Sequence, residues 1–396
     1  MTYTLVIKNA RLVLPHAVEY GALAIAGDRI DAIVPPDVTV PAAETIIDAD
    51  GAYVAPGFVD LHIHGAGGVD VMNATQQELE RLSAWLAERG ITRFLPTLVP
   101  DTDQAYRRAV SRISDWVGRT LVDTPAGAIP IGVHFEGPFL AAARCGALRS
   151  VLFRRADDLD RFLAKVGGER LEGLPARMMT VSPELSGGCE LVSELVRRGF
   201  VVSLGHTGAD IEVLEQAFEA GARHMTHFMN AMPQMHHRRP GPVGWGLLKR
   251  GLTVDVIADL HHLHPEALRL VIGARTATRV ALISDSIPPA GLGDGVYDVW
   301  GAPVTVAAGR AVNADGHLNG SVITVADAVR NCVSLGYRLV DAVRMATAVP
   351  ARVLGVESLG AIEQGRVADL VVFRDDIQPF LTVIAGRIVF DNASRQ

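Results

Sequence analysis

The sequence predicts an α/β protein, a closed (β/α)8 barrel of the TIM type with a small β-sandwich domain formed from the N- and C-terminal segments. Three observations lead to this fold class. The chain has 396 residues, of which 49% are hydrophobic, so it can bury a large core. Eight short apolar runs alternate with helical patterns in the middle of the chain, and both ends show strand patterns only.

The two ends of the chain consist of β-type runs separated by turn signals. The first 57 residues contain "YTLVIKNARLVL", "YGALAIAGDRIDAIVP" and "AETIIDADGAYVAPG", and the last forty contain "LGAIEQGRVADLVVFRDD" and "LTVIAGRIVFDN". Because chain termini often lie close together, we expect residues 1–54 and 360–396 to form one small sandwich domain. Residues 55–359 would then form the barrel inserted between them.

The eight central runs are rich in β-branched residues, and helical patterns separate most of them. They are "GFVDLHIH", "TRFLPTLV", "PIGVHFEG", "ARMMTVSP", "GFVVSLGH", "ARHMTHFM", "LTVDVIAD" and "RVALISDS". One intervening segment, "TQQELERLSAWLAERG", has Thr75 as a candidate N-cap and Gly90 as a candidate terminator. Strands that alternate with helices pair in parallel through crossovers, and eight such units match a closed barrel better than an open sheet.

Composition excludes several classes of protein. The net charge is −7 and the basic residues occur singly or in pairs, so we expect no nucleic-acid partner. No apolar stretch is long enough to span a bilayer and the N-terminus lacks a signal-peptide pattern, which indicates a cytoplasmic protein with no membrane partner. Cys145, Cys189 and Cys332 are far apart without CxxC spacing, which argues against a thiolate zinc site or a disulfide framework.

Metal-ligand and acid–base residue types gather at the ends of the predicted strands. His62 and His64 end the first run and, being two positions apart, would point to the same side of a strand. Four further residues end or nearly end the third, fifth, sixth and eighth runs: Glu136, His206, His227 and Asp285. Because the active site of such a barrel lies at the carboxyl ends of its strands, we expect all six side chains to meet there.

Imidazole and carboxylate without thiolate suit a catalytic divalent cation, with Zn²⁺ the first choice and Fe²⁺ or Co²⁺ as alternatives. A bound ion of this kind lowers the pKa of a water molecule to roughly 7 and polarises a carbonyl group. Asp285 is then the natural proton acceptor and later donor, and the chemistry is metal-assisted hydrolysis. The alternative for the His62 and His64 pair alone is a strand whose two imidazoles are satisfied by hydrogen bonds.

The residues now resemble a known family, the N-acetylglucosamine-6-phosphate deacetylase family of the amidohydrolase superfamily. The similarity extends along nearly the whole chain, through "PGFVDLHIHG", "HFEGPFL", "GHTGAD", "THFMNAMPQMHHRRPG", "IADLHHLHPEAL", "ISDSIPPAGLGDG" and "LGAIEQGRVADLVV". The resemblance implies a metal-bearing barrel that hydrolyses the acetamide of a phosphorylated amino sugar. It also implies that Glu136, His206 and His227 are the principal metal ligands and that Asp285 is the catalytic acid–base.

The resemblance assigns further residues and one oligomeric state. Family members differ at the His62 and His64 pair, so its presence here implies capacity for a second ion that Glu136 would bridge. Five residues match substrate-contacting positions: Ala147, Asn230, Ala231, Arg238 and His262. Arg238 matches an arginine that holds the sugar phosphate across a subunit interface, which implies a homodimer. Guanidinium suits phosphate because it donates two parallel hydrogen bonds.

One departure from the family pattern leaves the substrate open. The segment "CGALRS" places Leu148 where the family usually has a histidine that faces the substrate. Loss of that hydrogen bond costs about 1–3 kcal/mol or signals another substrate, unless Arg149 swings inward. The alternatives are the galacto epimer, an unphosphorylated N-acyl amino sugar, an N-acyl amino acid, or a catalytically silent metal-binding barrel. A dihydroorotase-like enzyme is disfavoured, since those relatives use a carboxylated lysine where this chain has Glu136.

Overall fold

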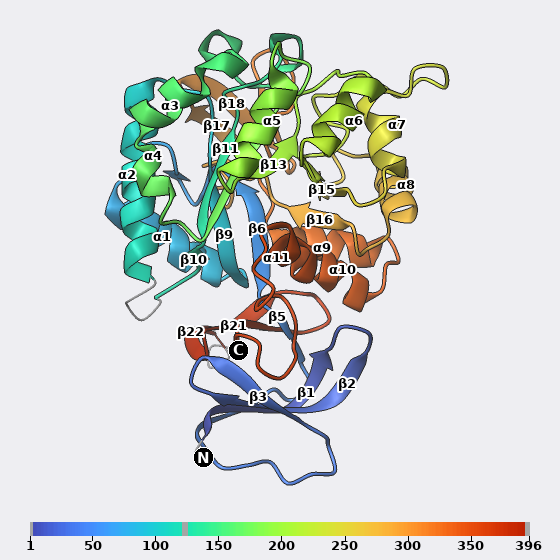
Figure 1. The fold of residues 1–396 in the computed structure, drawn as a ribbon. Helices are drawn as coiled ribbons and strands as arrows, with labels where there is room; N and C mark the ends of the chain where they lie inside the picture. The colour runs from blue at the N-terminus through green and yellow to red at the C-terminus, as the bar shows by residue number, and fades with distance from the viewer. Residues whose placement is uncertain (1–2, 121–125, 393–396) are drawn as a thin grey trace.

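The computed structural model describes residues 3–120 and 126–392 and contains the predicted barrel. All eight predicted runs form strands that pair in parallel (Figure 1). They are β6 (Phe58–Ile63), β9 (Ile91–Leu98), β11 (Gly132–Glu136), β12 (Ala176–Val181), β13 (Val201–Leu204), β14 (His224–Met225), β15 (Thr253–Ile257) and β16 (Val280–Ile283). The short β10 (Ile129–Pro130) also pairs with β9. The chain beyond β16 closes the barrel, because Asp285 N donates to His62 O at 2.9 Å and His64 N donates to Ser286 O at 2.8 Å.

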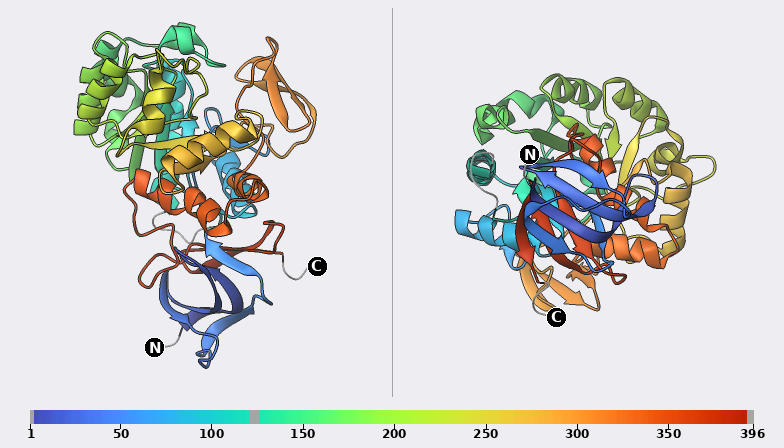
Figure 2. Two further views of the ribbon diagram at one scale, coloured as in Figure 1. Left: turned by 90° about the vertical axis from the view of Figure 1, so that its right-hand side faces the viewer. Right: turned by 90° about the horizontal axis from the view of Figure 1, so that it is seen from below.

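The helices surround the strands, as the view along the barrel in Figure 2 shows. They are α1 (Gln76–Ala87), α2 (Asp103–Thr120), α3 (Leu159–Val166), α4 (Gly168–Leu171), α5 (Gly188–Arg197), α6 (Ile211–Glu219), α7 (Gly241–Leu248), α8 (Pro265–Arg275), α9 (Val325–Ser334), α10 (Leu339–Ala346) and α11 (Ala348–Val353). In α1, Thr75 forms the expected N-cap, as part of a capping box with Glu78. Its buried Leu79, Leu82 and Leu86 recur at helical spacing and face the strands.

Strands from both ends of the chain form one eight-stranded sheet below the barrel (Figure 1). The N-terminal strands are β1 (Tyr3–Val13), β2 (Val18–Ala26), β3 (Arg29–Val34), β4 (Ala43–Asp48) and β5 (Tyr53–Pro56), and the C-terminal strands are β20 (Leu370–Phe373), β21 (Pro379–Ile384) and β22 (Arg387–Asp391). The two groups join where β5 pairs with β20, and they share one apolar core. The domain borders proposed above stay a prediction, and β5 continues in this sheet through Pro56.

A buried ion pair ties this sheet to the barrel. Arg93 on β9 donates from Nε to Asp369 Oδ2 at 2.6 Å and from Nη2 to Asp369 Oδ1 at 3.0 Å. The two side chains are 12% and 3% exposed, so water screens the pair poorly. Asp369 also accepts from the Ala385 backbone N–H at 2.8 Å. This carboxylate therefore fixes the C-terminal strands against the barrel.

Several short elements follow strands β6, β11 and β16. After β6 come β7 (Gly65–Ala66) and β8 (Val69–Asp70), and after β11 come the 3-10 helices η1 (Ala142–Arg144), η2 (Ser150–Leu152) and η3 (Ala156–Asp158). After β16, a three-stranded antiparallel sheet comprises β17 (Gly295–Val299), β18 (Ala302–Ala307) and β19 (Arg310–Asn313). Figure 2 shows this sheet at the end of the barrel remote from the small domain. The pattern of eight apolar runs does not predict this sheet.

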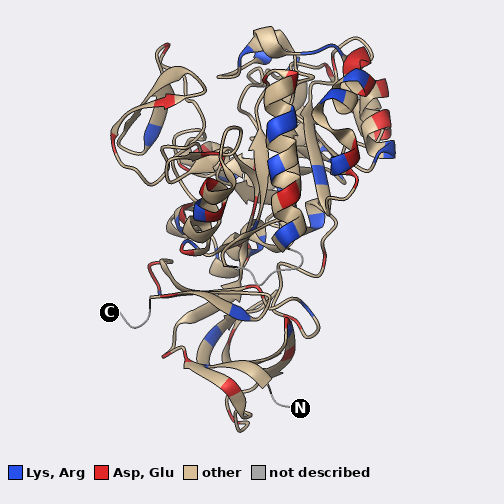
Figure 3. Ribbon diagram, turned by 90° about the vertical axis from the view of Figure 1, so that its left-hand side faces the viewer, with Lys and Arg blue, Asp and Glu red and all other residues tan. Residues whose placement is uncertain are grey.

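The charged residues and the cysteines are distributed over the whole chain. Acidic and basic residues intermingle along the helices of the side drawn in Figure 3. Within residues 3–120 and 126–392, no helix is both long and apolar enough to cross a bilayer. Cys145, Cys189 and Cys332 are free thiols, and Cys332 is buried.

Candidate metal centre and substrate cavity

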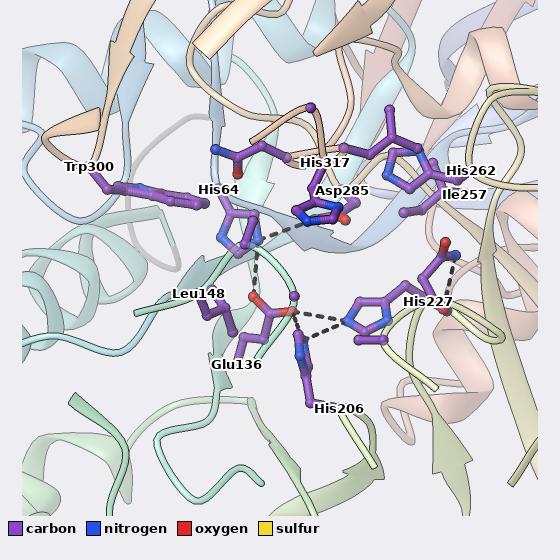
Figure 4. A pocket seen from close by; sticks show the side chains of 18 residues that line it. His64, Glu136, Leu148, His206, His227, Ile257, His262, Asp285, Trp300 and His317 are labelled. Carbon is purple, nitrogen blue, oxygen red and sulfur yellow. Dashed lines mark hydrogen bonds and ion pairs between the residues drawn. The ribbon is translucent and has the colours of Figure 1, made fainter. Parts of the chain in front are cut away.

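The six residues predicted to meet at the strand ends do meet. His62 lies within β6 and His64 directly after it, and Glu136 is the last residue of β11. His206, His227 and Asp285 each follow their strand by two residues. All six side chains belong to buried residues, which are between 0% and 7% exposed. In Figure 4, Glu136 lies between His64 on one side and His206 and His227 on the other.

One group of ligand atoms joins Glu136 to two imidazoles. The Nε2 atoms of His206 and His227 each lie 3.0 Å from Glu136 Oε1 and 3.1 Å from one another. Three electron-rich atoms thus converge at nearly equal distances. This is the atom arrangement of a site that could hold a metal ion.

A second group shares Glu136 with the histidine pair of β6. The Nε2 atoms of His62 and His64 lie 3.1 Å apart, as their two-residue spacing on a strand predicts. His64 Nε2 is 3.4 Å from Glu136 Oε2, and His62 Nε2 is 3.7 Å from Glu136 Oε1. This group could also hold an ion, and Glu136 belongs to both groups. A carboxylate can bridge two ions because it has two oxygens.

Hydrogen bonds on the far sides of the rings turn their Nε2 lone pairs toward Glu136. His206 Nδ1 donates to Arg144 O at 2.8 Å, and His64 Nδ1 donates to Thr97 O at 3.1 Å. A carbonyl oxygen can only accept, so both rings carry a proton on Nδ1 and present Nε2 to the centre. His227 Nδ1 is buried and has no hydrogen-bond partner among the described residues.

The charges of the site suit a cation. Burial opposes ionisation of Glu136, but the neighbouring His62, His206 and His227 rings hold the pKa of its carboxyl well below the usual range. In the absence of an ion, burial lowers the pKa of His62, but Asp285 and Glu136 outweigh it and raise that pKa to about 9. Protons and a divalent cation therefore compete for the same lone pairs. The donor set, all nitrogen and oxygen, fits the predicted ion.

Asp285 lies beside the histidine pair. Its Oδ1 is 3.2 Å from His64 Nε2 and 3.4 Å from His62 Nε2. Burial opposes its ionisation, but the two rings outweigh it and lower the pKa of the Asp285 carboxyl. The backbone at His206, His227 and Asp285 has φ values of 48°, 29° and 49°, in the left-handed region. Only a few per cent of non-glycine residues adopt this conformation, and Asp and His do so more often than most.

A cavity of about 370 Å³ opens onto these residues. Four of the predicted substrate contacts line it: Ala147, Asn230, Ala231 and His262. His262 Nδ1 is 2.7 Å from Asp259 Oδ2, so this ring is oriented by a carboxylate. Leu148 also lines the cavity and is 9% exposed.

Two arginines considered from the sequence lie elsewhere. Arg238 does not line this cavity but lines a second one of about 500 Å³, together with Arg144 and Arg239. Its role across a subunit interface stays a prediction. Arg149 donates to Asp101 at 3.2 Å and does not line the first cavity, so the suggestion that it replaces the missing histidine is not supported by its position.

Comparison with known proteins now gives the family. The model of the amidohydrolase family matches residues 53–391. The chain belongs to this family. It is 33% identical to N-acetylglucosamine-6-phosphate deacetylase of Bacillus subtilis, with 98% of each chain covered. It is 35% identical to N-acetylgalactosamine-6-phosphate deacetylase of Escherichia coli O157:H7, over 92% of this chain and 94% of the other.

Solved structures support the same relationship. A mutant of N-acetyl-D-glucosamine-6-phosphate deacetylase from Mycobacterium smegmatis, in complex with N-acetyl-D-glucosamine-6-phosphate, superposes with a TM-score of 0.87. It is 31% identical and covers 98% of this chain and 100% of its own. The deacetylase from Pasteurella multocida has a TM-score of 0.88 and 29% identity, over 97% of this chain and 99% of its own. The fold class and the family resemblance predicted from the sequence are confirmed.

This amidohydrolase also brings residues to the cavity that the sequence analysis missed. Trp300, His317 and Asn319 come from the three-stranded sheet after β16 and the loop that follows it. The Trp300 ring packs edge-on against His64, with ring centroids 5.2 Å apart. The turn-rich segments "AAGRAV" and "NADGHLNG" carried a hairpin signal. Nothing local to them indicated that this hairpin lies beside the strand ends.

Proposed function

We propose that this amidohydrolase removes the acetyl group from an N-acetylhexosamine 6-phosphate, with N-acetylglucosamine 6-phosphate as the first candidate, giving glucosamine 6-phosphate and acetate. The observation that carries the proposal is the convergence of Glu136, His206 and His227 beside Asp285, at the base of a cavity. Sequence relatives that carry this activity in their names support the choice of substrate.

We further propose that Glu136, His206 and His227 hold one divalent ion and that His62, His64 and Glu136 hold a second. Zn²⁺ is the first choice for both, with Fe²⁺ and Co²⁺ as alternatives. When bound, such an ion supplies a strong nucleophile from water at neutral pH and polarises the amide carbonyl.

The chain's own residues then carry the proton transfers. Asp285 accepts the proton that water loses as its oxygen attacks the acetamide carbon. The same carboxyl returns that proton to the nitrogen as the carbon–nitrogen bond breaks, so the products are a free amine and acetate. His262, oriented by Asp259 through the 2.7 Å contact, is placed to hydrogen-bond a polar group of the substrate in the cavity.

The phosphate requires a cationic partner, and the lining of the first cavity contains no arginine or lysine among the described residues. We propose that Arg238 of a second copy supplies it, which makes the enzyme a homodimer. Exchange of Arg238 for Met should raise KM for the phosphorylated sugar by more than tenfold and leave kcat for the unphosphorylated sugar unchanged. We also propose a cytoplasmic location for the enzyme, because its charged substrate does not cross a bilayer unaided.

Leu148 favours a second candidate, the galacto epimer. An apolar side chain stands where a polar contact is expected, and one relative is a deacetylase of N-acetylgalactosamine 6-phosphate. Loss or inversion of a hydroxyl contact changes selectivity by about 1–3 kcal/mol, or roughly 5- to 160-fold.

Release of acetate from three sugars tests the proposal. N-acetylglucosamine 6-phosphate, its galacto epimer and unphosphorylated N-acetylglucosamine should be compared by kcat/KM with metal-loaded enzyme. We expect the first to be hydrolysed fastest. A higher value for the epimer would select the second candidate. Absence of acetate from every phosphosugar would exclude both and leave an N-acyl amino acid substrate or a silent metal-binding barrel.

A further inference from the structure

A chain of buried polar contacts runs beneath the metal ligands, from β6 to β15. His62 Nδ1 lies 3.0 Å from Thr226 Oγ1, and Thr226 Oγ1 lies 3.2 Å from Asp255 Oδ2. His62, Thr226 and Asp255 are each 0% exposed. A buried polar group without a partner is costly, so the protons in this chain must be ordered.

The order of the protons follows from Asp255. A carboxylate only accepts hydrogen bonds, so the single hydroxyl proton of Thr226 points to Asp255. Thr226 Oγ1 must then accept from His62 Nδ1, which places a proton on that nitrogen. Nε2 of His62 is left facing His64 and Glu136. Asp255 thus sets the orientation and tautomer of a ligand that it does not touch.

His62 differs in this respect from two other imidazoles of the centre. His64 and His206 are oriented by the backbone carbonyls of Thr97 and Arg144, which no substitution removes. His62 Nδ1 is oriented by a side-chain hydroxyl. The His62 ring is also in edge-on contact with His134, at 4.7 Å between centroids, but His134 gives it no hydrogen bond among the described contacts.

Asp255 reaches the other ligand group as well. It accepts from the backbone N–H of His227, and it lies 2.8 Å from Nε2 of His224. The hydroxyl of Thr226 therefore acts on His62 alone, whereas the Asp255 carboxylate acts on one ligand of each group. This difference allows the two roles to be separated by substitution.

We propose that Thr226 and Asp255 are positioning residues that decide whether the His62, His64 and Glu136 site holds an ion. The Glu136, His206 and His227 site does not depend on the Thr226 hydroxyl. The inference rests on the proposed metal centre but not on the identity of the substrate, since it concerns the binding of ions to the protein alone.

Thr226→Val tests it, because valine has nearly the same shape but cannot accept from His62. Matched proteins are Thr226→Ser, which keeps a hydroxyl, and Thr180→Val, which removes another buried barrel hydroxyl that lies 2.8 Å from His134 Nε2. Each protein is stripped with a chelator and titrated with Zn²⁺ and then Co²⁺. Bound ions are counted by elemental analysis after equilibrium dialysis, with the Co²⁺ absorption spectrum as a second readout.

We expect two ions in the wild type, in Thr226→Ser and in Thr180→Val. Thr226→Val should keep the first ion at wild-type affinity and bind the second 10- to 100-fold more weakly, the usual effect of losing a group that orients a ligand. Asp255→Asn should weaken the binding of both ions. Its amide has one acceptor oxygen in place of two, so it cannot replace the carboxylate as acceptor for both Thr226 and the His227 N–H. If the metal-free valine variant does not fold, Thr226→Ala lacks the hydroxyl without adding a methyl group and takes its place.

Three results would overturn the proposal. These are a single ion in the saturated wild type, two ions of wild-type affinity in Thr226→Val, and an equal loss in Thr226→Val and Thr180→Val. None of these measurements involves a sugar. An enzyme that binds two ions as expected but deacetylates no phosphosugar would refute the proposed function and leave this inference intact.

Discussion

Replacement of Asp285 by asparagine removes the proton acceptor while leaving the site almost unchanged in shape. The backbone at this position has φ of 49°, and asparagine tolerates the left-handed region better than most residues. The backbone hydrogen bonds of Asp285 to His62 and Ser321 do not involve the side chain, so they persist in the variant. Asp285 also belongs to neither group of ligand atoms identified here. We therefore expect Asp285→Asn to fold and to bind its ions.

The expected loss lies in the chemical step. A positioned general acid–base contributes about 10²- to 10⁴-fold to the rate, which corresponds to about 2.7–5.4 kcal/mol of the activation barrier. Asp285 is 7% exposed but lines the cavity, so water can reach this position and the loss should stay within this range. Because the carboxylate takes the proton only as the reaction proceeds, kcat should fall and KM should change little.

Steady-state acetate release and elemental analysis of the same preparations check this. Asp285→Glu, which keeps a carboxylate at a shifted position, is the matched control and should retain more activity than Asp285→Asn. A wild-type kcat in Asp285→Asn would refute the assigned role. Loss of both ions together with activity would show that Asp285 is a metal ligand and not mainly a proton carrier.

Three further outcomes are expected. Asp369→Ala leaves Arg93 buried without its partner and should lower the free energy of unfolding by about 3–5 kcal/mol. Urea unfolding midpoints measure this loss, and the metal content should not change. An unshifted midpoint would contradict the prediction. Burial raises the pKa of Cys332 to about 12. An aromatic disulfide reagent at pH 8 should therefore label this thiol only after the protein unfolds. Rapid labelling of Cys332 in the native protein would show that the thiol is accessible. Removal of metal should lower the melting temperature, because an ion at a hundred times its Kd stabilises the folded state by about 2.7 kcal/mol. A melting temperature that does not change with added Zn²⁺ would argue against a metal site in the folded protein.

The barrel could be predicted because its signals are local. Each strand is a short apolar run bounded by turn residues, and α1 carries its own cap at Thr75. The meeting of the six site residues followed from one topological rule, that parallel strands bring their carboxyl ends to the same rim. This prediction needs only the order of the strands in the barrel, and the alternation of strands with helices gives that order.

Contacts that depend on two distant segments could not be predicted in this way. Nothing near Thr226 in the sequence indicates that its hydroxyl faces His62, 164 positions away. The three-stranded sheet and following loop that carry Trp300 and His317 have ordinary turn signals, but their placement at the cavity depends on packing against the barrel. The sequence allowed Arg149 to face the cavity, but in the structure its guanidinium donates to Asp101.

Contacts within the barrel hold the residues of the metal centre in place. His206, His227 and Asp285 each hold a left-handed backbone conformation, which costs about 1–3 kcal/mol. The compensation comes from the strands that precede these residues and from bonds such as the one that the His227 backbone donates to buried Asp255. We expect a site built in this way to be formed before an ion arrives, so that binding requires little reorganisation. The metal-free protein should therefore keep the secondary structure of the loaded enzyme and should still unfold cooperatively, although its melting temperature is lower. Adding metal back should restore activity without a slow refolding phase.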